Sequence, residues 1–66
     1  MTVEEIKKFI SEKGLRLMEY RYFKDTDTHL FKVRDLNWDV HSIFLKKPDL
    51  EEFKVMLNLK NVKTKE

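Results

Sequence analysis

Cysteine is absent from this 66-residue sequence, and glycine and proline occur once each. Without cysteine the chain has no disulfides, no thiolate zinc site and no cysteine nucleophile. The single glycine excludes every glycine-rich phosphate loop, since such loops need several residues without a side chain close to the phosphates. Secreted domains this small usually carry disulfides, so we expect the chain to work in a reducing, cytoplasmic compartment.

Long apolar runs and a strong net charge are also missing. No run approaches the roughly 20 apolar residues of a membrane-spanning helix, and the acidic start, Met1 to Glu5, lacks the apolar segment of a signal peptide. Fourteen Lys and Arg stand against twelve Asp and Glu, which gives a formal net charge of +2 at pH 7. Composition therefore gives no strong reason to expect nucleic acid as a partner, although one face of a neutral molecule can still be basic.

The length of the chain limits what the fold can hold. A domain of this size buries only ~60% of the surface that its unfolded chain exposes, so few side chains are left to line an enclosed pocket. Small domains of this kind more often act through their surface. We expect residues 1–61 to form a single domain, and 62–66, which have little to bury, to fray.

The first segment has the pattern of an amphipathic helix. Thr2 and Glu5 have the spacing of a capping box, and apolar residues then recur at helical spacing. Gly14 suits the left-handed position after the last turn, with Leu15 placed to fold back on the helix in a Schellman ending. These signals predict a helix over residues 3–13.

A second helix is predicted near the C-terminus. Either Pro48 takes its first position, or Asp49 caps it with Glu52 at capping-box spacing, and it should end at about Leu59. Its apolar stripe consists of Leu50, Phe53, Met56 and Leu57.

Three strands are predicted between the helices, over residues 16–24, 29–34 and 38–45. The breaks at 25–28 and 35–37 are short and polar, so the strands should form an antiparallel meander. Two helices cannot bury their apolar stripes separately, so both should pack on one face of the sheet. The expected fold is α+β with the order α-β-β-β-α.

One face of the predicted sheet should be apolar and the other charged. The alternation of side chains predicts which residues lie under the helices: Tyr20, Tyr22, Phe31, Val33 and Phe44. Met18 should lie on the same side of its strand as Tyr20 and Tyr22. The opposite, open face should carry charges of both signs, from Glu19, Arg21, Lys32, Arg34, Asp39 and His41.

Catalytic and metal-binding groups are few. Asp39 and His41 are two apart on a strand and so share a face, and His29 could complete a His-His-Asp zinc set if the strands pair closely. This spacing matches no known metal site, so we expect no metal and no cofactor. Ser42 adjoins His41 but points to the other side of the strand, and Ser11 lies within a helix, so we expect no catalytic residue and no enzyme activity.

Three apolar residues do not fit the layer under the helices: Phe23, Leu30 and Trp38. Together with Arg21 and Arg34 they form our candidate protein-binding surface, because protein interfaces favour aromatic side chains and arginine. At least one of the three should be an exposed apolar contact.

Nucleic acid is the alternative partner. Aromatic side chains on an open sheet face, interleaved with cations, can stack bases. The candidate cations are Arg21, Lys32, Arg34, Lys46 and Lys47.

The order of elements resembles that of double-stranded-RNA-binding domains. The matching residues are Tyr20, His29, Phe31, Val33 and the pair Lys46-Lys47. That family has a glycine-bearing loop before the lysine pair, and a further lysine and an alanine-rich face in its last helix, all of which are missing here. Asp49, Glu51 and Glu52 put acids where the family has cations, so the resemblance implies the fold and not the RNA contact.

A second resemblance is to a family of small proteins of the eukaryotic and archaeal large ribosomal subunit. The segments 4–9 and 31–34 are similar to its first helix and central strand, at similar separation. That family is far more basic, and we adopt neither resemblance as an assignment.

The sequence therefore favours a small non-enzymatic binding module that acts by protein–protein contact, as an adaptor, inhibitor or regulator of the kind that phages and mobile elements encode. A nucleic-acid-binding module is the alternative, and the identity of the partner and the formation of a homodimer are left open.

Overall fold

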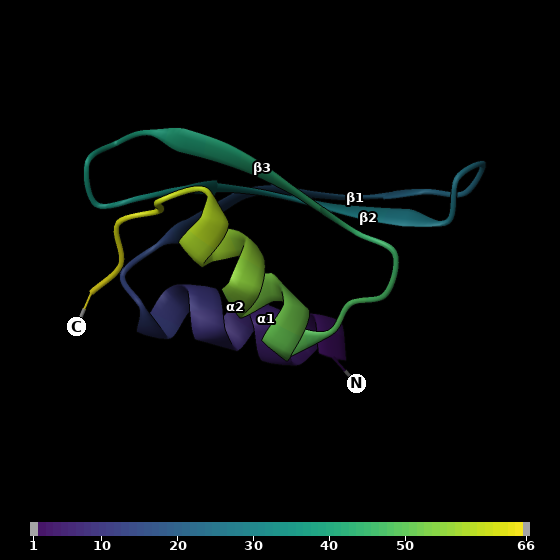
Figure 1. The fold of residues 1–66 in the computed structure, drawn as a ribbon, viewed down its shortest axis with the longest axis horizontal. Coiled ribbons are helices and arrows are strands. Elements are labelled where there is room, and N and C mark those ends of the chain that lie inside the picture. The colour runs from purple at the N-terminus through teal and green to yellow at the C-terminus, as the bar shows by residue number, and fades with distance from the viewer. Residues whose placement is uncertain (1, 66) are drawn as a thin grey trace.

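The computed structural model describes residues 2–65, which form two helices and a three-stranded sheet. In chain order the elements are α1 (Thr2–Glu12), β1 (Arg16–Phe23), β2 (Thr28–Arg34), β3 (Val40–Leu45) and α2 (Leu50–Leu59). The strands pair antiparallel in the order β1-β2-β3, and both helices lie on the same side of the sheet (Figure 1). The predicted α+β class and α-β-β-β-α order are confirmed. In the described part of the chain, neither helix is long and apolar enough to cross a membrane.

Helix α1 ends as the sequence predicts. The Leu15 N–H donates to the Ile10 carbonyl (3.0 Å) and the Gly14 N–H to the Ser11 carbonyl (3.2 Å), which are the two bonds of a Schellman motif. Gly14 takes the left-handed conformation at φ +77°. The side chain of Thr2 lies outside the described residues, so the capping box at the start of α1 stays a prediction.

Helix α2 is capped at both ends by local contacts. The Asp49 carboxylate accepts the Glu52 N–H at 3.3 Å, as predicted for an N-cap. At the other end Asn61 takes a left-handed φ of 54°. The Val62 N–H then donates to the Leu57 carbonyl at 3.1 Å. Asparagine thus ends α2 much as glycine ends α1, and the chain turns back toward the core.

The C-terminal segment, which we expected to fray, makes specific contacts over residues 62–65. Its Lys63 carbonyl accepts the Leu36 N–H at 3.3 Å, and its Lys65 N–H donates to the Lys13 carbonyl at 2.7 Å. Val62 also packs against the core. These partners lie far away in the sequence, so a local reading of a polar tail could not anticipate them.

The hydrophobic core lies between the sheet and the two helices. At its centre the Phe53 ring of α2 meets Phe31 of β2 edge-on, with ring centroids 5.5 Å apart, and Phe9 of α1 at 6.2 Å. Such aromatic pairs contribute about 0.5–1.5 kcal/mol beyond the burial of their area. The buried members of the core are Ile6, Ile10, Leu15, Phe31, Val33, Ile43, Leu45, Phe53 and Leu57.

Substitution of two leucines in α2 tests how much this core contributes to the free energy of unfolding. Leu57 is 4% exposed and Leu59 is 73% exposed, so Leu57→Ala removes core contacts that Leu59→Ala does not. We expect Leu57→Ala to lower the free energy of unfolding by about 2–5 kcal/mol, and Leu59→Ala to change it by no more than about 0.5 kcal/mol. Urea denaturation followed by circular dichroism measures both, and equal losses would contradict this core.

Candidate functional site

The sheet has one face that neither helix covers (Figure 1). Along β2, Phe31 and Val33 belong to the core, so Leu30, Lys32 and Arg34 point to the opposite side. Directly paired residues of antiparallel strands share a face, so the register extends this surface across the sheet. We call it the open face, and it consists of Arg16, Glu19, Arg21 and Phe23 of β1, Thr28, Leu30, Lys32 and Arg34 of β2, and Val40, Ser42 and Phe44 of β3.

A β-bulge decides which residues of β1 reach the open face. Leu17 pairs with Val33 and Glu19 pairs with Lys32, so Met18 is an extra residue between them. Leu17 therefore faces the helices before the bulge, as Tyr20 does after it. Met18, which we expected on the helix side, is instead the unpaired residue of the bulge and is 46% exposed.

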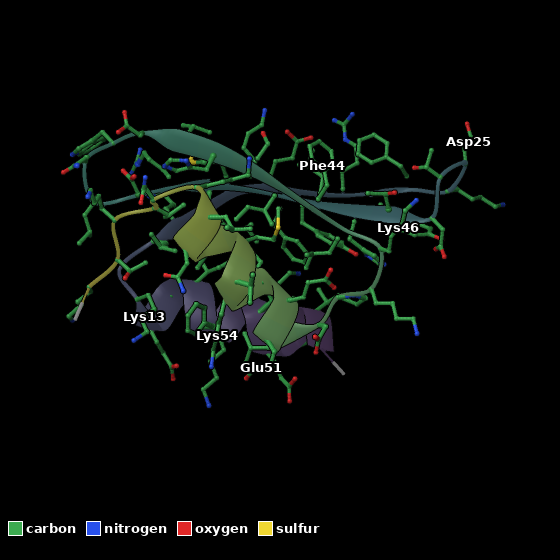
Figure 2. All side chains as sticks on the ribbon, viewed as in Figure 1. Lys13, Asp25, Phe44, Lys46, Glu51 and Lys54 are labelled. Carbon is green, nitrogen blue, oxygen red and sulfur yellow. The ribbon has the colours of Figure 1, made fainter. Side chains whose placement is uncertain are left out.

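Two residues of β3 lie on the opposite side from the one predicted. Phe44 pairs with Leu30 on the open face and is 54% exposed, whereas we expected it under the helices; in Figure 2 it lies on the side of the sheet away from the helices. His41 pairs with Val33, and so lies on the helix side instead of the open face. The cause is that β3 buries Ile43 and Leu45, which sets the alternation one residue away from the predicted one.

The charged side chains of the open face are mostly cations. Its single carboxylate, Glu19, lies 2.7 Å from the guanidinium of Arg21 and 3.7 Å from the ammonium of Lys32. Four cations less one carboxylate give this face +3, and since the whole chain nets +2, the rest of the chain nets −1. The near-balance of the composition therefore conceals a basic face. Its cations are Arg16, Arg21, Lys32 and Arg34.

An apolar hollow of about 510 Å³ opens at one end of this face. Phe23 at the end of β1 and Phe44 of β3 form two of its walls. At its edge the Lys46 ammonium donates to the Thr26 carbonyl at 2.7 Å, which ties the end of β3 to the β1–β2 turn. The remaining lining residues are Thr28 and Leu45.

Trp38 stands at the other end of β3, in the loop between β2 and β3. Its side chain is 73% exposed, and the guanidinium carbon of Arg34 lies 4.1 Å from the ring centroid. Its backbone is left-handed at φ 70°, which is rare for a bulky residue and costs on the order of 1–3 kcal/mol. The predicted start of β3 at Trp38 is therefore wrong, because β3 begins at Val40.

The buried carboxylate of Asp35 holds this loop in its strained conformation. It accepts the backbone N–H groups of Asn37 (2.8 Å) and Asp39 (3.0 Å) within the loop. It also accepts the N–H of Lys63 from the C-terminal segment (3.4 Å) and lies 2.8 Å from the His41 Nε2. Four donors from three parts of the chain thus converge on one carboxylate, and they fix the backbone that presents the indole.

These hydrogen bonds also set the acidity of Asp35. Burial alone raises the pKa of a carboxyl group, since it disfavours the charged form. At Asp35 the hydrogen bonds from His41 and from the Asp39, Lys63 and Asn37 backbones outweigh burial, and the pKa falls from 3.8 to about 2. Sequence reasoning placed Asp35 in a turn but missed this role. The local signal was an aspartate two residues before a turn asparagine, whereas the bonds to His41 and Lys63 had none.

The zinc set considered from the sequence is not assembled. His29 pairs with Leu45 and His41 with Val33, so the two imidazoles lie toward different ends of β2. The His29 Nδ1 instead lies 2.7 Å from the Tyr20 hydroxyl. Within residues 2–65 no three His, Asp or Glu side chains gather as metal ligands.

The structure brings the candidate protein-binding residues to one surface. Arg21, Phe23, Leu30 and Arg34 all lie on the open face, and Trp38 stacks beside Arg34. Leu30 is buried beneath its neighbours there, so it supports the surface without being an exposed contact.

The candidate nucleic-acid-binding cations do not all lie on the same surface. Arg21, Lys32 and Arg34 share the open face, and Lys46 borders the hollow at its edge. Lys47 is exposed beyond the end of β3, off the strands that form the face.

Acid titration tests the role of Asp35. Because its pKa is lower in the folded chain, the ionised carboxylate stabilises the fold above pH 3.8, and this stabilisation is lost as the pH falls toward 2. We expect the thermal midpoint of the wild type to drop between pH 4 and pH 2 more steeply than that of Asp35→Asn. Asp25→Asn, at an exposed position in the β1–β2 turn, is the matched control and should retain the wild-type slope. Parallel curves for the wild type and Asp35→Asn would contradict the role.

Comparison with known proteins adds no relative to this description. No family model matches the chain, and neither does any curated protein or solved structure. The resemblances to double-stranded-RNA-binding domains and to a ribosomal protein family thus gain no support, and a function has to be argued from the surface itself.

Proposed function

We propose that the chain is a non-enzymatic binding module that holds nucleic acid on the open face of its sheet. The observation that carries this proposal is the +3 charge of that face in a chain whose remainder nets −1. Cations that neutralise phosphates supply most of the affinity in nucleic-acid binding. An anionic partner therefore gains most by lying on this side of the molecule.

The aromatic side chains of the same surface support a nucleic-acid partner further. Trp38 and Phe44 are more than half exposed, and Phe23 lines the hollow beside Phe44. Aromatic rings beside arginine and lysine are the groups that stack bases and hold phosphates.

A protein partner is the second candidate, and the apolar hollow between Phe23 and Phe44 favours it. A hollow of this kind can take an apolar side chain, and arginine and tryptophan are common at the centre of protein interfaces. The charge asymmetry favours a protein partner less than nucleic acid unless that protein is itself acidic. A second copy of the chain is disfavoured as the occupant, since two faces of +3 repel each other.

Salt dependence tests the proposal. For four cations that each neutralise one phosphate, the logarithm of the binding constant should fall against the logarithm of salt concentration with a slope of roughly −3 to −3.5. We expect the variant Arg16→Gln/Arg34→Gln to reduce the magnitude of this slope by about 1.5 for mixed-sequence oligonucleotides. Fluorescence anisotropy of a labelled oligonucleotide measures it. The two arginines lie directly opposite each other, so their removal relieves repulsion between them, and circular dichroism verifies that the variant folds.

The matched control is Lys8→Gln/Lys60→Gln. It makes the same change in net charge, but at exposed positions on α1 and at the end of α2. We expect it to leave the slope nearly unchanged. Equal effects of the two double variants would mean that net charge alone attracts the oligonucleotide, and no binding at low salt would reject the proposal.

A further inference from the structure

We propose that the open face takes a single-stranded nucleic acid, whose bases stack on Trp38 and Phe44 along β3 while cations of β2 hold its phosphates. This inference rests on the proposed function and narrows it, since a basic face alone would also hold a duplex.

The exposed rings favour unpaired bases. Trp38 and Phe44 present large apolar surfaces to solvent at 73% and 54% exposure. In a duplex the faces of the bases stack on one another, so a protein ring meets only groove edges and phosphates. In a single strand the base faces are free, and stacking on the two rings buries apolar surface on both partners.

The register of the sheet places Phe44 beside the strand that carries the cations of β2, and the contact with Arg34 places the Trp38 ring at the other end of β3. Val40 and Phe44 of β3 are four residues apart on the same face, about 14 Å along an extended strand, and Trp38 lies just before them in the chain. On β2, Arg34 pairs with Val40 and Lys32 pairs with Ser42, so two cations lie beside the path between the rings. A strand that follows β3 can thus place its bases on the two rings and its phosphates over β2.

Trp38 is held in position before any ligand arrives. Its φ of 70° is maintained by the Asp35 carboxylate, which bonds the backbone N–H groups on both sides of it, at Asn37 and Asp39. The guanidinium of Arg34 lies 4.1 Å from the indole centroid and covers one face of the ring, so a base would stack on the other face. Because these hydrogen bonds already fix the backbone of the loop, binding costs less conformational entropy than it would for an unstructured loop.

The single tryptophan of the chain provides the test. The full chain is titrated with a single-stranded oligothymidylate within the roughly 4–16 nucleotides that single-strand-binding sheets cover, and separately with a duplex of the same length. We expect the single strand to bind more tightly and to quench the emission of Trp38. Trp38→Ala should weaken single-strand binding by roughly 5- to 150-fold, the effect of one stacked base, and Phe44→Ala should act in the same direction.

Leu59→Ala is the matched control, because Leu59 is also 73% exposed but lies in α2 on the other side of the sheet. It should bind as the wild type does. Trp38→Tyr, which keeps an aromatic ring, should restore part of the affinity, and circular dichroism verifies that each variant folds.

The outcomes separate this inference from the proposed function. Tighter binding of the duplex, or single-strand binding that is indifferent to both Trp38→Ala and Phe44→Ala, would overturn the inference and leave nucleic-acid binding in place. If neither oligonucleotide binds at low salt, both proposals fail.

Discussion

The contact between Phe31 and Phe53 determines which part of the molecule can act as a surface. It joins α2 to the central strand, and through Phe9 it also engages α1, so both helices lie against the same face of the sheet. The described residues, 2–65, form no third layer that covers the other face. The open face therefore follows from the packing of the core.

A buried hydrogen-bond network fixes the β2–β3 loop, which carries Trp38 beside the open face. The buried carboxylate of Asp35 ties the β2–β3 loop to β3 through His41 and to the C-terminal segment through Lys63. Left-handed backbone at a residue as bulky as Trp38 persists only where the surroundings over-determine it, and these hydrogen bonds supply the surroundings. The backbone that carries the exposed indole is thus fixed by hydrogen bonds to other parts of the chain.

The open face carries a net positive charge. The overall charge of the chain is nearly balanced, and for that reason composition alone gave no strong reason to expect nucleic acid as the partner. Alternation along β1 and β2 sends Arg16, Arg21, Lys32 and Arg34 to one side, with Glu19 as their counter-charge. An average over the chain cannot reveal such a separation, since it depends on which residues share a face.

Local signals along the chain were sufficient for the element order and for the ends of the helices. Gly14 with Leu15, and Asp49 with Glu52, act through hydrogen bonds that close within a few residues, so their meaning can be read without knowing the fold. The α+β class follows in the same way, because two amphipathic helices flanking three short strands have few ways to bury their apolar sides.

Only tertiary contacts decided which side of the sheet each strand residue faces. They also decided the conformation of the β2–β3 loop and the packing of residues 62–65. The bulge at Met18 arises from pairing with β2, and Phe44 faces outward because Ile43 and Leu45 meet the helices. Asp35 finds two of its donors at His41 and Lys63, six and 28 residues away. A shift of one residue in register moves every side chain of a strand to the other face, and nothing within a strand's own sequence selects between the two registers until its partners are in place.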